Sequence, residues 1–187
     1  GNHDFDGGLD AKGQIRRFLK GTGNSSETIW FDTWISGYHF VFLGGEAAGL
    51  HADLSNAQLA WLEETLAKDR VEGRPTFLFL HQGLMDTVAG TFKYQNWHGV
   101  KQSTQLRRIL RQYPEVVLFS GHSHWTMESA HTVKPADSSL PSVVSTASCA
   151  YLWDDSCIAT NVGIVGSEGY YIYLYENCLI VRGRSFD

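Results

Sequence analysis

Short apolar runs alternate with longer amphipathic stretches along much of this chain. Thr76 to Leu80 and Val116 to Phe119 are too short for helices and are bounded by Gly or Pro, so they predict buried strands. Ile29 to Ile35 and Tyr38 to Leu43 are rich in strand-forming residues and are separated by Ser36-Gly37. This second pair therefore predicts a β-hairpin.

Three segments have helical patterns. Leu54 to Leu66 has the clearest start, because Ser55 as N-cap and Gln58 three residues later match a capping box. A second helix is predicted after Ser103, which we expect to cap it, and a weaker one over Leu9 to Lys20. The helix after Ser103 connects the two buried runs, which predicts a strand-helix-strand unit.

Strands dominate the end of the chain. They are predicted at Ser142 to Ser148, Tyr170 to Tyr175 and Leu179 to Arg182. The last two alternate in polarity and predict a terminal hairpin. Helices alternating with strands, followed by a strand-rich end, indicate an α/β fold with two packed sheets flanked by helices.

Composition limits the classes of protein to consider. With 187 residues, of which 43% are hydrophobic, the chain fits a single domain, residues 1–187. A net charge of −5 argues against a basic surface for nucleic-acid polymers. No apolar run approaches the 18 residues or so of a membrane span. Three cysteines without a C-x-x-C motif suggest neither a disulfide framework nor a zinc ribbon, and their redox state stays open.

Polar, metal-ligating residues follow both buried runs. His81 comes directly after the first run, and His122 and His124 follow the second after one glycine. Ligands collect at the carboxyl ends of strands in α/β sheets, and neutral imidazole is the commonest metal ligand. The opening residues Asn2 and His3, followed by a carboxylate, add further candidate groups. The pattern indicates a metal site at one rim of the sheet.

These motifs and their order resemble one known family. G-N-H-D at residues 1–4, a strand ending in His81, and G-H-S-H at residues 121–124 are similar to the motifs of calcineurin-like metallophosphoesterases. The segment LSNAQLAWLEETL at residues 54–66 looks most like the bacterial branch that contains class III cyclic-nucleotide phosphodiesterases. The resemblance implies a four-layer α/β/β/α sandwich. It also implies that the D-x-H and G-D-x-x-D motifs of the family, absent here, belong to a missing N-terminal portion.

The resemblance also assigns roles to individual residues. Asn2, His81 and His122 resemble the ligands of one divalent ion, and His124 resembles a ligand of the other. The implied ions are manganese, iron or zinc, about 3.5 to 4 Å apart, with a bridging hydroxide that attacks a phosphate mono- or diester in line. His3 resembles a residue that protonates the leaving oxygen, with the neighbouring Asp4 holding its ring.

Two further residues are candidates for the substrate pocket. Trp125 follows the last histidine of the motif, and His98 lies in the long loop from Gln82 to Val100, in a polar setting. An aromatic ring there is suited to stacking on a nucleobase, so a nucleotide is one candidate substrate. His39, His51 and His131 have no such context and are expected to be structural or on the surface, and Asp154 and Asp155 are expected to be loop solubilisers.

An incomplete ligand set has consequences for this chain. One metal would have three protein ligands and no bridging aspartate, and the other would have one ligand, so we expect partial or no metal occupancy and impaired activity of the chain alone. A bared apolar sheet face predicts self-association. The alternative hypothesis is a non-catalytic remnant or interaction module that keeps the fold. The sequence does not fix the cellular localisation, and the cytoplasm is the default expectation.

Overall fold

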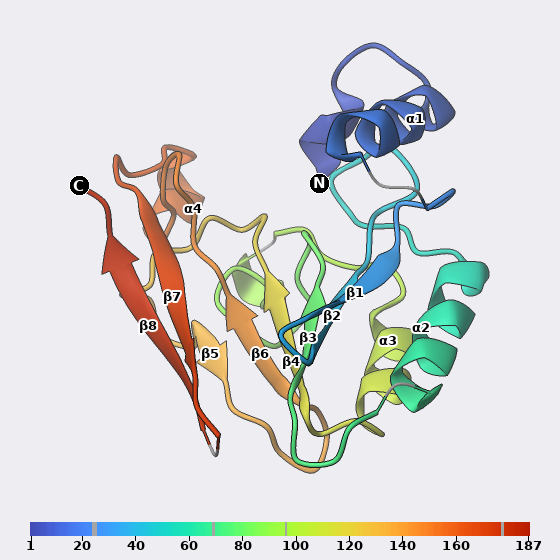
Figure 1. The fold of residues 1–187 in the computed structure, drawn as a ribbon. Helices are drawn as coiled ribbons and strands as arrows, with labels where there is room; N and C mark the ends of the chain where they lie inside the picture. The colour runs from blue at the N-terminus through green and yellow to red at the C-terminus, as the bar shows by residue number, and fades with distance from the viewer. Residues whose placement is uncertain (24–25, 69, 96, 177) are drawn as a thin grey trace.

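The computed structural model of the chain describes residues 1–23, 26–68, 70–95, 97–176 and 178–187. Its centre is a six-stranded mixed sheet in the order β1-β2-β3-β4-β6-β5 (Figure 1). The strands are β1 (Phe31–Ile35), β2 (Tyr38–Phe42), β3 (Thr76–Phe79), β4 (Val116–Ser120), β5 (Val133–Lys134) and β6 (Ser142–Ser145). β2, β3, β4 and β6 run parallel, and the antiparallel strands β1 and β5 form the edges.

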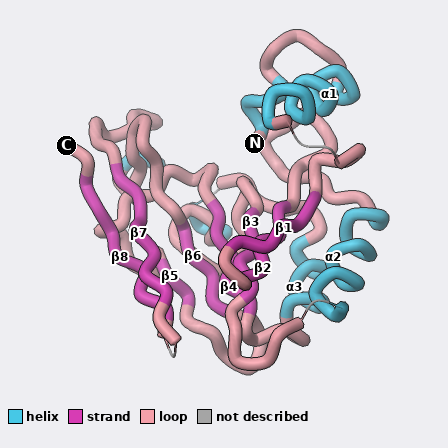
Figure 2. Tube along the Cα trace, in the orientation of Figure 1, coloured by secondary structure: helices cyan, strands magenta, loops and turns pink. Residues whose placement is uncertain are grey.

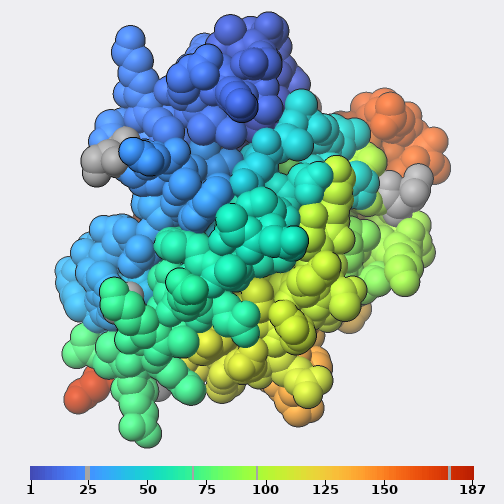
Figure 3. Space-filling model, turned by 90° about the vertical axis from the view of Figure 1, so that its right-hand side faces the viewer, coloured from blue at the N-terminus to red at the C-terminus, as the bar shows by residue number. Residues whose placement is uncertain are grey.

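Helices and a second sheet cover opposite faces of the central sheet. The helical segments are η1 (Asn2–Phe5), α1 (Ala11–Thr22), α2 (Asn56–Lys68), η2 (Lys93–Gln95), α3 (Ser103–Leu110) and α4 (Cys157–Thr160). α2 and α3 lie side by side on one face, with the N-terminal segments above them (Figure 3). The hairpin of β7 (Glu168–Leu174) and β8 (Leu179–Ser185) lies on the other side of the central sheet (Figure 2). Among the described residues, no helix is long and apolar enough to cross a membrane.

Side chains alternate between the two faces of the sheet, as strand geometry requires. Leu78 and Leu118 point into a buried aliphatic cluster with α2 and α3. Phe77 and Phe119, one position away, belong to a separate cluster on the opposite face, against which β7 and β8 pack. The expectation of two packed sheets flanked by helices is therefore confirmed.

The predicted strands and helices are largely confirmed. Ser36 and Gly37, which join β1 to β2, have φ angles of 51° and 78°, the left-handed conformation typical of two-residue hairpin turns. The parallel pairing of β3 with β4 around α3 confirms the strand-helix-strand unit. The strand predicted over Ser142 to Ser148 ends at Ser145, and the short strand β5 was not predicted.

Two predicted helix caps need correction. Ser55 Oγ does accept a hydrogen bond from the Gln58 amide, 3.2 Å away, but the Gln58 side chain does not return to Ser55. It bonds instead to the Gly44 backbone and to Glu46, whose carboxylate accepts the Ser55 N–H. Ser103 is the first residue of α3 and Gln102 is its N-cap; the Ser103 hydroxyl donates to the Val100 carbonyl.

The loop from Gln82 to Val100 is more buried than its sequence suggests. Leu84, Val88 and Ala89 are almost fully buried. The polar setting expected around Trp97 is wrong, because Trp97 packs in an apolar cluster, whereas Tyr94 is exposed. Gly90 has a φ of +80°, and a Cβ there would lie 2.2 Å from the Ser123 side chain. Close packing therefore holds this loop against the segment after β4; Asn96 lies outside the described residues.

Candidate metal centre

The topology brings the histidines of two strands to one rim. β3 and β4 are parallel neighbours in which Phe79 is paired with Phe119, so the residues after both strands leave the sheet at the same end. The Gly121 N–H donates to the His81 carbonyl at 3.0 Å and fixes the two strand ends to each other. Both predicted strand-end histidine motifs therefore lie side by side.

Asn2 joins this rim from the start of the chain. Its side-chain Oδ1 lies 3.0 Å from His81 Nε2 and 3.1 Å from His122 Nδ1. The amide is buried, with 6% of its surface exposed. Gly1 allows this approach, because a Cβ at that position would lie 2.5 Å from the His81 ring. Three side chains that are far apart in sequence thus converge on one point.

Both imidazoles of this cluster are held neutral. Burial lowers the pKa of His81 to about 4, with a further contribution from neighbouring positive charge. Burial also lowers the pKa of His122 to about 3, and the neighbouring histidines add to the effect. Only the neutral ring has a lone pair for a metal ion, so these environments suit ligation near neutral pH.

The cluster fits one divalent ion chemically. Two imidazole nitrogens and an amide oxygen are the donors preferred by borderline transition metals. Both rings lie at hydrogen-bond distance from a single acceptor, Asn2 Oδ1, while the buried His122 Nε2 has no hydrogen-bond partner among the described residues. Shifting the ring proton of His122 from Nδ1 to Nε2 would free the lone pair that faces Asn2. Within the described ranges no group of three or more His, Cys, Asp or Glu side chains could hold an ion, so the amide oxygen is essential to the set.

His124 lies apart from these three donors but near enough to influence them. Its positive charge contributes to the lowered pKa of both His81 and His122. Its Nδ1 lies 3.1 Å from the Tyr151 carbonyl, which leaves Nε2 as its free ring atom. A metal-ligating histidine typically has such a carbonyl on its other nitrogen. His122 and His124 have φ angles of 66° and 59°, a strained conformation that often marks functional sites.

The predicted pairing of His3 with Asp4 is wrong. His3 is 77% exposed at its side chain, and its Nδ1 lies 2.6 Å from the carboxylate of Asp6. Asp4 instead contacts the ammonium group of Gly1. The spacing i to i+3 in a helical turn places Asp6 beside His3, whereas adjacent residues point in different directions. That spacing was visible in the sequence and identifies the carboxylate that sequence reasoning missed.

Trp125 is not available for stacking on a substrate. Its side chain is fully buried, and its Nε1 donates to Asp155 Oδ1 at 3.2 Å. It packs with Trp97 and Trp153 in a cluster of indoles. Asp155 also accepts a hydrogen bond from Gln95, at 2.7 Å, so it links two loops and is not merely a solubiliser.

His98 lies close to the cluster but does not join it. Its ring is 6.3 Å from that of His122, measured between centroids, and its Nδ1 is 3.3 Å from His51 Nε2. Burial, and secondarily His51, lower the pKa of His98. The structure thus gives His51 a partner within the site region, although its sequence context offered no signal.

Comparison with known proteins rests on structure alone. No family model matches the sequence, and no curated protein matches it. Seven chains of solved structures do match, among them a dimetal phosphatase from Danio rerio with a TM-score of 0.67 and 15% identity. The match covers 99% of this chain and 68% of that chain. The chain therefore shares the α/β sandwich fold of that phosphatase. At this level of identity the likeness concerns the fold and leaves the chemistry to the residues of the rim.

Proposed function

We propose that this chain carries part of the catalytic centre of a metal-dependent phosphoesterase that hydrolyses phosphate mono- or diesters. The observation that supports the proposal is the convergence of Asn2 Oδ1, His81 Nε2 and His122 Nδ1 within about hydrogen-bond distance. The buried His122 Nε2 has no hydrogen-bond partner among the described residues, which is costly unless a ligand satisfies it, and the cluster lies where ligands collect in α/β folds.

Asn2, His81 and His122 would hold one divalent ion, and His124 would contribute to a second. A bound ion of this kind neutralises phosphoryl charge and lowers the pKa of water. The protein orients the histidine rings that would bind these ions. The carbonyl of Tyr151 sets the tautomer of His124, and burial keeps the first pair of rings unprotonated.

His3 is the candidate acid for the leaving oxygen. Its Nδ1 donates to Asp6 Oδ2 at 2.6 Å, so Nε2 is the ring atom left to face a substrate, and it would give up a proton from the doubly protonated ring. A carboxylate hydrogen-bonded to the far nitrogen fixes the direction of an imidazole ring. We propose Asp6, in place of Asp4, as the orienting group.

The described donors do not complete a two-metal centre. Catalytic sites of this type have about three protein ligands for each ion, and His124 stands without a second described ligand. We therefore propose that residues beyond these four donors complete the site, and that the chain alone binds manganese weakly and turns over slowly, so that both are measured with manganese in excess.

The test compares two histidines that share a backbone conformation. His122→Asn and His131→Asn both replace a residue with positive φ, at 66° and 64°, by one that tolerates it. We expect the first variant to abolish manganese binding measured by calorimetry, and the second to leave it unchanged. Hydrolysis of an aryl phosphomonoester and an aryl phosphodiester then identifies the ester class. Equal manganese affinity in both variants would remove the basis of the proposal.

A non-catalytic module that keeps the fold is the second candidate. It is favoured by the absence, within the described ranges, of any cluster of three His, Cys, Asp or Glu side chains. Intact folding without manganese binding in the unmodified chain is the result that this candidate predicts.

A further inference from the structure

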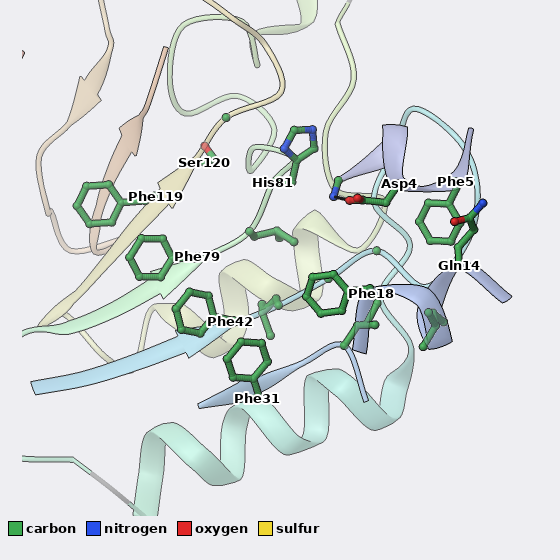
Figure 4. Close-up of a pocket in the computed structure, with 18 of the residues that line it drawn as sticks. Asp4, Phe5, Gln14, Phe18, Phe31, Phe42, Phe79, His81, Phe119 and Ser120 are labelled. Carbon is green, nitrogen blue, oxygen red and sulfur yellow. Dashed lines mark hydrogen bonds and ion pairs between the residues drawn. The ribbon is translucent and has the colours of Figure 1, made fainter. Parts of the chain in front are cut away.

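The hollow beside His81 offers a phosphate group little to bind (Figure 4). Phenylalanines on the face of the central sheet opposite α2 and α3 form much of its lining, and its only ionisable side chains are those of Asp4 and His81. A carboxylate repels a phosphate, and the lining contains no Lys or Arg. Hydrogen-bond donors for a phosphate are therefore expected elsewhere on the rim of the candidate metal centre.

A pair of histidines, His51 and His98, lies on another part of this rim. They belong to the loops that follow β2 and β3, and the carboxyl ends of these two strands meet at the rim because the strands are parallel. The two rings are 4.8 Å apart, measured between centroids, and the ring of His98 is 6.3 Å from that of His122. The pair therefore borders the donors proposed for the first ion.

Backbone hydrogen bonds join the two loops next to this pair. The Ala52 N–H donates to the Gly99 carbonyl at 3.1 Å, and the Lys101 N–H donates to the Ala52 carbonyl at 3.0 Å. Ala52 and Val100, which form this bridge, are at most 2% exposed. A Cβ at Gly99 would lie 2.6 Å from the Gly83 carbonyl oxygen, so the backbone is closely packed here. The two loops are therefore fixed relative to each other.

The hydrogen bonds of Gly99 decide where the proton of the first ring lies. Gly99 is buried, and its N–H has one partner among the described residues, His51 Nδ1 at 3.3 Å. A buried backbone N–H needs an acceptor, so His51 Nδ1 carries the lone pair and Nε2 carries the proton. His51 Nδ1 also lies 3.1 Å from the Gly99 carbonyl, but that oxygen already accepts from Ala52.

The second ring of the pair then has a defined tautomer as well. His98 Nδ1 lies 3.3 Å from His51 Nε2 and accepts its hydrogen bond, so the proton of His98 is on Nε2. This Nε2 has no hydrogen-bond partner among the described residues. Burial, and next His51, lower the pKa of His98, so the ring is neutral near pH 7. A chain of hydrogen bonds thus runs from the Gly99 N–H through His51 to a free N–H on His98.

Such a donor fits the charges around it. Among the described residues, no Lys or Arg contributes to the shifted pKa values of the four histidines at this rim, His81, His98, His122 and His124. A phosphate held here would therefore depend on the bound ions and on neutral N–H groups. A hydrogen bond from an N–H to a charged oxygen is stronger than one to a neutral acceptor, and a chain of hydrogen bonds strengthens its last donor.

We propose that His98 Nε2 donates a hydrogen bond to a non-bridging oxygen of the substrate's phosphate, and that His51 is the positioning residue that fixes the tautomer and direction of the His98 ring. This inference rests on the proposed function, which places the phosphate at the ion held by Asn2, His81 and His122. His98 keeps its proton throughout, because it acts as a hydrogen-bond donor and not as an acid.

Proton–nitrogen correlation spectra of the histidine side chains test the tautomers in the metal-free chain. His51 and His98 should both carry their proton on Nε2. In His51→Leu the His98 ring should lose its single tautomer, whereas in His51→Gln it should keep it, because the glutamine amide can donate to His98 Nδ1. A His98 proton on Nδ1 in the parent chain would overturn the inference.

Calorimetric titration of inorganic phosphate in excess manganese tests the contact itself. His98→Leu removes the donor and should weaken phosphate binding about tenfold, whereas His98→Gln, whose amide N–H can take the place of Nε2, should weaken it less than about threefold. His51→Leu should weaken phosphate binding about threefold, and His51→Gln should restore the parent affinity. Manganese affinity should stay close to that of the parent in every variant, because neither ring is a proposed ligand of the ions.

The outcomes separate this inference from the proposed function. Equal losses with leucine and with glutamine at residue 98 would assign the effect to packing and overturn the inference, as would a phosphate affinity that neither substitution changes. In both cases manganese binding by the parent chain would leave the proposed function standing. Absence of manganese binding by the parent chain would contradict the proposed function, and the inference would fall with it.

Discussion

The two faces of the central sheet differ in how completely they are covered. On the helix side, Leu78 and Leu118 are at most 1% exposed, within one large aliphatic cluster. On the other side, Phe42 and Phe79 remain half-buried, because the β7–β8 hairpin covers only part of that face. The closed face contributes most of the buried apolar packing, and the open face leaves space beside the rim of the candidate metal centre.

The largest expected effect compares a deletion on each face. Leu118→Ala should lower the free energy of unfolding by about 3 kcal/mol, because it leaves a cavity in close packing. Phe42→Ala deletes more atoms but should cost less, about 1.5 kcal/mol, since its ring already faces open space. Urea denaturation of both variants measures the difference. A larger loss for Phe42→Ala would mean that the aromatic face is closed in solution.

A polar residue on the closed side should have the next largest effect. Gln58 is fully buried and exchanges hydrogen bonds with the Gly44 N–H, at 3.0 Å, and the Gly44 carbonyl, at 2.9 Å. Gln58→Leu removes these partners from buried backbone groups, which should cost about 2 kcal/mol. Gln112→Leu, at an exposed position, serves as the control and should change stability by less than about 0.5 kcal/mol.

These cases show where sequence reasoning succeeds and where it fails. The runs that contain Leu78 and Leu118 predict strands because a strand in the middle of a sheet has apolar side chains on both faces. Such a strand is visible in the sequence as a short continuous apolar run. The histidines after them predict a shared rim because parallel strands end together. Both features can be predicted without knowing which distant segments are in contact.

Other features depend on contacts between distant segments. Gln58 matches a local capping box, yet its actual partner lies 14 residues earlier in the chain. Trp125 follows a site motif, but its neighbours Trp97 and Trp153 bury it. A sequence pattern indicates only hydrogen-bond and packing partners that are near in sequence. Tertiary packing selects partners from the whole chain.

A strained residue on the rim of the candidate metal centre gives a smaller prediction, in which a substitution stabilises the protein. Ala147 follows β6 at this rim with a φ of 55°, a conformation that costs an L-residue about 1 to 2 kcal/mol. Ala147→Gly should therefore raise the free energy of unfolding by about 0.5 to 1 kcal/mol, after the added entropy of the unfolded chain. Ala60→Gly, in the exposed face of α2, should instead lower it by about 1 kcal/mol. Destabilisation by both substitutions would show that Ala147 is not strained.

The smallest expected effect concerns a charge near the closed face. Hydrogen bonds from Lys101, and next from Gln102, lower the pKa of Asp53 below its ordinary value of 3.8. A lowered carboxyl pKa means that the unfolded chain binds the proton more readily, so the contribution to stability is present above pH 3.8 and is lost as the pH falls through the folded-state pKa.

Asp53→Asn should consequently lower the free energy of unfolding by about 0.5 kcal/mol at pH 7, a modest figure because solvent screens this largely exposed group. The difference between variant and parent should shrink as the pH falls below 3.8. Urea midpoints at pH 7 and pH 3 measure it. A difference that stays constant with pH would assign the effect to packing and not to charge. A difference larger than that of Gln58→Leu would mean that ion pairing, more than dry packing, keeps the helix side closed.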